Sequence, residues 1–136
     1  MSEYRTISGY DRKAERKLTR AMEDYLEMVC RYCKEHAYIR INQLANQLHV
    51  APSSASKMAE QLKDQKLIEY EKYGYIRPTA MGWELGGYFL ERHEILQRFL
   101  CMINDSDDEL EQTELTEHFF DQRTILNMKK WLEKNK

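Results

Sequence analysis

The feature that most constrains the fold of this chain is a pair of short helical patterns separated by a tight turn. The first pattern is expected to begin at Asn42, a good N-cap residue, and its apolar positions have helical spacing: Leu44, Ala45 and Leu48. The second is expected to open at Ser53 and to run to about Gln65, after a turn at residues 49–52. Because Ala45 is small, the two helices can cross closely. This is the pattern of a helix-turn-helix.

Two β-prone stretches follow the second helical pattern directly. They cover residues 67–71 and 75–77, and Lys72, Tyr73 and Gly74 stand between them. Gly74 can adopt a positive φ, which suits the turn of a hairpin. A helix-turn-helix followed by a hairpin predicts a winged helix-turn-helix.

Long helices are expected on both sides of this segment. Residues 11–35 contain no Pro or Gly and are predicted to form one helix. Its first turns carry basic side chains that share one side of the helix: Arg12, Lys13, Arg16, Lys17 and Arg20. This basic stripe is either an arm that contacts DNA phosphates or a solvated helix face.

A second long helix is expected at residues 80–102, with Thr79 as its N-cap. It contains Gly82, Gly86 and Gly87, each of which costs about 1 kcal/mol relative to Ala in a helix interior. These glycines indicate either the close approach of another backbone or simple tolerance. Shorter helices are expected at about residues 108–119 and from residue 121 or 122 to 133. The predicted fold class is mainly α with a small β wing.

Composition and charge narrow the class of protein. The chain is 42% hydrophobic, which is too apolar for general disorder, and no apolar run approaches the roughly 18 residues of a membrane span. No secretory signal is evident, so a cytoplasmic location is expected. The net charge is −2, yet residues 1–80 carry 14 Lys and Arg against 11 Asp and Glu, whereas residues 81–136 carry 7 against 12. This asymmetry suits a basic DNA reader joined to an acidic regulatory half, although chance segregation of surface charge gives the same pattern.

The three cysteines do not form a recognisable metal site. Cys30 and Cys33 have the spacing of half a zinc site, but no second pair completes four ligands. They are expected to be reduced thiols that pack in the interior.

Three clusters of carboxylates and histidines are candidates for metal binding. They stand at both sides of the predicted reader: Asp24 and Glu27, then His93, then Glu114, Glu117 and His118. The spacings of i, i+3 or i+4 place the side chains of one cluster on one face of a helix. Taken singly, each cluster is also explained by solvated surface charge. Together, ligands that straddle a DNA reader indicate a metal-controlled transcription factor.

The order of five short motifs resembles that of one known family. The motifs are MEDYLE, APSSASKM, LIEYEKYGY, RHEILQRFL and ELTEHF, and they resemble the manganese-responsive regulators of the diphtheria-toxin-repressor family, the DtxR/MntR group. The resemblance implies a winged helix-turn-helix DNA-binding domain at residues 1–78 and a helical metal-binding and dimerisation domain at residues 79–136. It also implies that the six residues of the three clusters are the metal ligands, that the protein is no enzyme, and that a homodimer binds a pseudo-palindromic operator.

The DNA-contacting residues are predicted from the start of the second helix and from the wing. In a helix-turn-helix, the N-terminal residues of the second helix meet base edges in the major groove. Here these residues are Pro52, Ser53, Ser54, Ser56 and Lys57. The wing offers four more to the flanking phosphates: Lys72, Tyr73, Tyr75 and Arg77. The alternative is a winged helix used for protein contacts, in which the serines only cap the helix.

Two positions favour manganese over iron. The resemblance implies Met in iron-type relatives where Asp24 stands, and Cys where Glu114 stands, and oxygen donors suit the harder Mn²⁺. Asp24, Glu27, Glu114 and Glu117 carry four negative charges, which two Mn²⁺ ions per subunit would neutralise. Fe²⁺, Co²⁺, Zn²⁺ or Cd²⁺ are possible substitutes. The predicted mechanism is a hinge in which metal ties the first helix to the second domain and so fixes the spacing of the two readers in a dimer.

Three other functions are compatible with parts of this pattern. An iron-responsive regulator of the same family would differ in its ligands, and a metal-independent winged-helix repressor would bind DNA equally well with a chelator present. A carboxylate-bridged di-metal enzyme built on a helical bundle needs two Glu-x-x-His motifs, and this chain has none. The favoured interpretation is a repressor that uses Mn²⁺ as co-repressor and controls metal homeostasis, such as manganese uptake.

Overall fold

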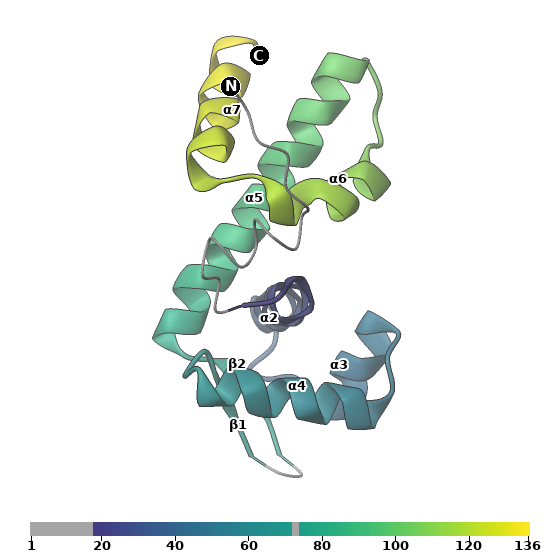
Figure 1. Cartoon of the computed structure of the whole chain (residues 1–136), viewed down its shortest axis with the longest axis vertical. Helices are drawn as coiled ribbons and strands as arrows, with labels where there is room; N and C mark the ends of the chain where they lie inside the picture. Colours follow the sequence, from purple (N-terminus) through teal and green to yellow (C-terminus); the bar gives the residue numbers. More distant parts are fainter. Residues whose placement is uncertain (1–17, 72–73) are drawn as a thin grey trace, which may run out of the picture.

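The computed structural model describes residues 18–71 and 74–136. It contains the following elements: α2 (Arg20–Cys33), α3 (Ile41–Leu48), α4 (Pro52–Asp64), β1 (Ile68–Tyr70), β2 (Ile76–Pro78), α5 (Ala80–Asn104), α6 (Leu110–Thr116), the 3-10 helix η1 (Glu117–Phe119) and α7 (Gln122–Lys134). The long helix α5 runs from the winged-helix end of the molecule to the end that holds α6 and α7, and α2 lies between these ends (Figure 1). The predicted fold class, mainly α with a small β wing, is confirmed.

The helix-turn-helix forms as predicted, although both helices begin earlier than expected. Helix α3 begins at Ile41 with Arg40 as N-cap, so the prediction of Asn42 as the cap is wrong. The reason is a side-chain contact: the backbone N–H of Arg40 donates to Gln43 Oε1 at 3.0 Å. This hydrogen bond places the N-cap at Arg40, two residues before Asn42. Helix α4 begins at Pro52, whose fixed φ suits the first helical position. Between them His49 adopts φ 57°, the left-handed conformation that ends α3.

The wing is a two-stranded antiparallel sheet. Glu69 pairs with Arg77 in its register, and their side chains form an ion pair of 2.6 Å. The first strand is shorter than predicted, the second has the predicted length but lies one residue later, and Gly74 does not adopt a positive φ. On the other side of β2, Ile39 forms an isolated bridge with Ile76, which anchors the segment before α3 to the wing.

Helix α2 begins at Arg20, so the prediction of one helix from residue 11 is wrong. Thr19 is the N-cap, and its side chain accepts a hydrogen bond of 3.1 Å from the backbone N–H of Met22. Four of the predicted basic arm residues, Arg12, Lys13, Arg16 and Lys17, lie outside the described residues.

The buried face of α2 belongs to the larger of two hydrophobic clusters. This cluster joins α2 to the helix-turn-helix and the wing through fully buried side chains: Leu26, Val29, Cys30, Ile39, Leu44, Leu62 and Ile76. Burial raises the pKa of the Cys30 thiol to about 12, so this cysteine is a protonated core residue. All three cysteines are free.

The second cluster lies in the C-terminal half, where α7 packs on α5. Its buried side chains are Ile95, Ile125 and Leu132. The helix predicted at residues 108–119 is divided into α6 and η1, and α7 begins after an Asp121 N-cap, as predicted. Within the described ranges, no helix combines the length and apolar character needed to cross a membrane. The division of the chain into domains at residues 78 and 79 stays a prediction.

Two of the three glycines of α5 lie against other parts of the chain. A Cβ at Gly82 would overlap the carbonyl oxygen of Leu67, and one at Gly86 would overlap Sγ of Cys30 on α2. A Cβ at Gly87 would meet no atom within 4 Å. Close approach therefore explains Gly82 and Gly86, whereas Gly87 is tolerated.

We expect the substitutions Gly82→Ala and Gly87→Ala to have opposite effects on the free energy of unfolding. Gly87→Ala should stabilise by about 0.5–1 kcal/mol, because Ala is the better helix former and the space is open. Gly82→Ala should destabilise by about 1–3 kcal/mol, because the backbone of Leu67 must move. Urea unfolding followed by circular dichroism measures both, and equal effects of the two substitutions would contradict the packing described.

Candidate metal centre and nucleic-acid interface

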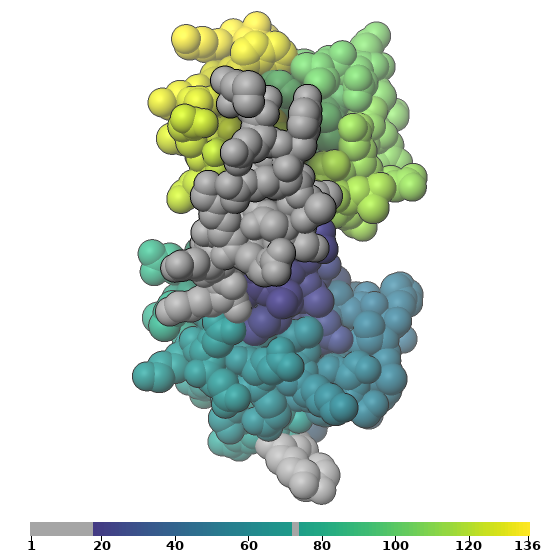
Figure 2. Space-filling model, viewed as in Figure 1, coloured from purple at the N-terminus to yellow at the C-terminus, as the bar shows by residue number. Residues whose placement is uncertain are grey.

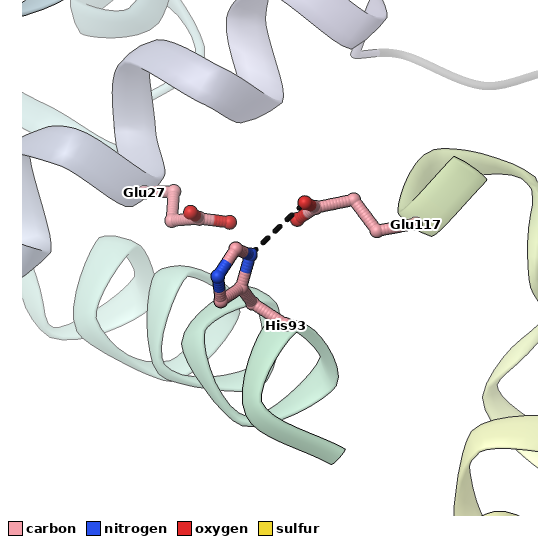
Figure 3. A group of neighbouring side chains, drawn as sticks. All are labelled: Glu27, His93 and Glu117. Atoms are coloured by element: carbon pink, nitrogen blue, oxygen red, sulfur yellow. Dashed lines mark hydrogen bonds and ion pairs between the residues drawn. The ribbon is translucent and has the colours of Figure 1, made fainter. Parts of the chain in front are cut away.

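Three elements converge on one group of possible metal ligands. Glu27 projects from α2, His93 from α5 and Glu117 from η1, and their side chains point toward one another (Figure 3). One donor atom from each lies within 4.8 Å of the others. His93 Nδ1 is 3.1 Å from Glu117 Oε2. Residues from three separate parts of the sequence thus form a compact set of oxygen and nitrogen donors.

The other three predicted ligands adjoin this group. His118 Nε2 lies 3.0 Å from Asp24 Oδ1, which joins η1 to α2 a second time. Glu114 is exposed and lines, together with Asp24, Glu27 and Glu117, a groove of about 570 Å³. The structure therefore brings five of the predicted residues into contacts in two adjacent sets and leaves Glu114 on the wall of the groove.

The electrostatics of the group favour a cation. Glu27 Oε1 and Glu117 Oε1 are buried and have no hydrogen-bond partner among the described residues. Burial, and then the negative charge of Glu117, raise the pKa of Glu27 to about 7. A buried carboxylate oxygen without a hydrogen bond is costly, and a divalent ion would both pair these two oxygens and remove the repulsion between the carboxylates. The residues present thus fit a divalent metal.

Both histidines form hydrogen bonds with neighbouring carboxylates. The hydrogen bond with Glu117 raises the pKa of His93. Burial would lower the pKa of His118, but hydrogen bonds with Asp24 and Glu23 raise it to about 9. A metal ion that binds these rings replaces a proton or a carboxylate contact on each.

Two buried residues behind this group were missed by the sequence reasoning. Glu23 Oε1 lies 3.1 Å from Arg92 Nη2 and 2.7 Å from His118 Nδ1. Arg92 also lies under the ring of Phe89, with Cζ 4.7 Å from its centroid. The sequence does indicate that Arg92 is buried, because it occurs at helical spacing between Phe89 and Leu96, in the buried stripe of α5.

The predicted DNA-binding residues lie at the winged-helix end of the molecule. Figure 2 shows α4 and the wing at one end and α6 and α7 at the other. Pro52, Ser53, Ser54 and Lys57 are exposed, and Ser56 is half-buried. Tyr75 is 49% exposed.

The structure describes two of the four predicted wing contacts, Tyr75 and Arg77. The guanidinium of Arg77 is engaged by Glu69 at 2.6 Å. Lys72 and Tyr73 lie outside the described residues.

A groove of about 580 Å³ beside α4 adds a residue that the sequence reasoning missed. Arg40 lines it together with Ser56 and Lys57. Arg40 lies over a pair of tyrosine rings, Tyr38 and Tyr75, whose centroids are 3.9 Å apart. The bridge between Ile39 and Ile76 explains why these rings meet.

A helix-turn-helix with an exposed second helix and a wing defines a winged-helix DNA-binding protein, and the donor group attached to it indicates a regulator controlled by a ligand. The comparisons with known proteins agree. Residues 17–76 match the family described as "Iron dependent repressor, N-terminal DNA binding domain". The chain is 36% identical over 92 residues to the HTH-type transcriptional regulator MntR of Geobacillus kaustophilus, an alignment that covers 68% of this chain and 65% of the relative.

Two further matches extend the likeness. The MntR of Listeria welshimeri is 35% identical over 108 residues, which cover 79% of this chain and 76% of the relative. The crystal structure of the metal-dependent transcriptional regulator MtsR superimposes with a TM-score of 0.72 at 25% identity, and the match covers 85% of this chain and 55% of MtsR. The chain thus spans about half of MtsR and about two thirds of the Geobacillus relative.

This chain belongs to the DtxR/MntR family of metal-dependent, DNA-binding transcriptional regulators. The family predicted from the sequence is confirmed, and it is a family of transcriptional regulators.

Proposed function

We propose that this protein is a cytoplasmic repressor that binds DNA as a homodimer when Mn²⁺ occupies the group formed by α2, α5 and η1. The observation that carries the proposal is the convergence of Glu27, His93 and Glu117 from these three elements. The protein would thereby control metal homeostasis, such as manganese uptake. The names of the relatives and the donor chemistry both support this conclusion.

The donor set supports manganese as the metal. The proposed ligands are four carboxylates and two imidazoles: Asp24, Glu27, Glu114, Glu117, His93 and His118. Carboxylate oxygens suit hard ions, and thiol or thioether donors would suit softer ones. When bound, the metal supplies positive charge that joins carboxylates which otherwise repel one another. Four negative charges support a pair of divalent ions in each subunit.

Helix α2 explains how this group can act on DNA binding. One face of α2 carries Asp24 and Glu27, and another buries Leu26 and Val29 in the core of the winged helix. Because that core is close-packed, the winged helix follows α2 as a rigid unit. Contacts from α2 to His93, Glu117 and His118 therefore set the orientation of α4 relative to the C-terminal half. In a two-fold dimer, this orientation sets the distance between the two α4 helices.

On the DNA, we assign direct contacts to the start of α4. Ser53, Ser54 and Lys57 are exposed there and can reach base edges or phosphates in the major groove. Arg40 extends the same surface through the groove that it shares with Ser56 and Lys57. Arg77 is expected to contribute less, because Glu69 neutralises it.

Removal of metal should weaken operator binding at least tenfold, roughly 1.4 kcal/mol. The physical reason is that the carboxylates of α2 and η1 lose the cation that joins them. The operator is first selected from random duplex DNA with Mn²⁺ present, and its affinity is then measured by fluorescence anisotropy with Mn²⁺, Fe²⁺, Zn²⁺ or a chelator. Equal affinity in chelator would favour a metal-independent repressor, and activation by Fe²⁺ but not Mn²⁺ would favour the iron-responsive alternative.

The protein should form a two-fold dimer through its C-terminal half. Large apolar side chains are exposed on the elements after residue 100: Met102, Ile103, Leu110, Leu115, Phe119, Leu126 and Trp131. Such surface is commonly buried between subunits. Sedimentation at micromolar concentration should give twice the chain mass, and a monomer both with and without Mn²⁺ would contradict the dimer.

The substitution Asp24→Met should shift the metal preference away from manganese. It removes one negative charge and the Oδ1 atom that lies 3.0 Å from His118 Nε2, and it offers a thioether instead. The concentration of Mn²⁺ needed for half-maximal operator binding should rise, whereas the Fe²⁺ or Co²⁺ requirement should change less. Anaerobic titrations of each ion measure this, with Asp107→Met as a control because Asp107 is exposed and outside the donor group. Superimposable Mn²⁺ curves for wild type and Asp24→Met would refute the role of Asp24.

A further inference from the structure

A buried polar cluster lies directly behind the proposed ligands. Its members come from the same three elements: Glu23 from α2, Arg92 from α5 and His118 from η1. Their exposed fractions are 7%, 3% and 5%. Buried charged groups persist only where they are paired and hydrogen-bonded, so this cluster needs a physical explanation.

The contacts fix the direction of the hydrogen bond at His118. Its Nδ1 lies 2.7 Å from Glu23 Oε1 and 3.3 Å from Arg92 Nη2. A carboxylate only accepts, so the shorter contact requires Nδ1 to carry a hydrogen and to donate it to Glu23. Arg92 then cannot donate to the same nitrogen, and its hydrogen bond goes to Glu23 Oε1 at 3.1 Å. Nε2 faces the Asp24 carboxylate at 3.0 Å and donates to it in the metal-free protein, so a metal ion bound at Nε2 would take the place of that hydrogen.

We propose that Glu23 and Arg92 are positioning residues for the metal centre, in which Glu23 holds His118 with Nε2 available for metal and Arg92 holds Glu23. This inference rests on the proposed function. Histidines that bind metals characteristically donate their other ring nitrogen to a carboxylate or carbonyl, which fixes the orientation of the ring and increases its basicity. Neither Glu23 nor Arg92 is itself a proposed ligand.

Arg92 also separates two kinds of carboxylate in this region. It lies 3.1 Å from Glu23 and 3.8 Å from Glu117 Oε1, the second distance being too long for a hydrogen bond. Arg92 therefore gives its hydrogen bond to Glu23, which faces His118, and has only a longer ion pair with Glu117. Glu27, in turn, pairs through Oε2 with Arg31 at 2.8 Å.

The test must separate positioning from folding. Removing Glu23 alone would leave Arg92 buried without its main partner, so both are replaced together in Glu23→Met/Arg92→Met. Exchange of a buried ion pair for apolar residues of similar volume is often tolerated, and the double variant should still unfold cooperatively. Glu23→Gln is the second variant, because it keeps the shape of the side chain and loses only the charge. Glu91→Gln is the control, since Glu91 forms an exposed ion pair of 3.3 Å between α5 and Lys129 on α7.

Two measurements are made on each folded variant. Electron paramagnetic resonance of free Mn²⁺ gives the Mn²⁺ affinity, and nitrogen-15 NMR of the Zn²⁺-loaded protein detects the ring N–H of His118. We expect the double variant to bind Mn²⁺ about 10- to 100-fold more weakly and to lose the slowly exchanging Nδ1–H signal. Glu23→Gln should show a smaller loss of affinity, and Glu91→Gln should match wild type.

The outcomes distinguish this inference from the function on which it rests. Wild type and a folded double variant with Mn²⁺ affinities within about twofold of each other would overturn the positioning role and leave the proposed function intact. An unchanged Nδ1–H signal in the double variant would also overturn it. If the double variant fails to fold, unchanged Mn²⁺ affinity in Glu23→Gln has the same consequence. A wild-type protein that binds no Mn²⁺ would instead overturn the proposed function.

Discussion

The packing of helix α2 between two different environments is the constraint on which the rest of this structure depends. One face of α2 buries Leu26, Val29 and Cys30 in the core of the winged helix, so the reader and α2 form one unit. Another face carries acidic side chains that meet α5 and η1. A helix is rigid over this length, and a change at the acidic face is therefore transmitted to the reader without any change inside the reader itself. This division of faces connects the fold to the proposed control by metal.

Burial of like charges is the physical basis for the proposed binding of cations at the acidic face. Glu23, Glu27 and Glu117 come together from α2 and η1 with low exposure, and each must find a positive partner or a proton. Arg92 forms a hydrogen bond with Glu23, and Arg31 pairs with Glu27 through Oε2. Glu27 and Glu117 nevertheless each keep one buried oxygen without a hydrogen-bond partner among the described residues. The same imbalance that raises the pKa of Glu27 to about 7 thus makes a divalent ion favourable there. Specificity for a particular ion then depends on the donor atoms that complete the set.

Local patterns in the sequence predicted the elements of this fold but not their ends. Apolar periodicity and turn residues identify α3, α4 and α5, because these signals act over a few residues. The first residue of a helix depends on single side chains. Hydrogen bonds of Thr19 and Gln43 fix the starts of α2 and α3 at positions that helix propensity alone does not predict. Residue types and spacing marked the three clusters as candidate ligands, and the family resemblance implied that they form one site; its assignment as a metal site stays a prediction. The Glu23–Arg92–His118 cluster joins residues 69 and 95 positions apart, a separation at which neither periodicity nor spacing carries information.

The contact between α2 and α5 also indicates where the proposed hinge can turn. Cys30, near the C-terminal end of α2, donates to the Gly82 carbonyl at 3.5 Å and fills the space that the missing side chain of Gly86 leaves. This close contact holds the C-terminal part of α2 on the first turns of α5. Asp24 and Glu27 lie one to two turns before it, on the side of α2 that faces η1. A rotation of α2 about the Cys30 contact therefore moves Asp24 and Glu27 relative to η1. Contacts from these two residues to the C-terminal half would restrain that rotation and, with it, the position of the winged helix.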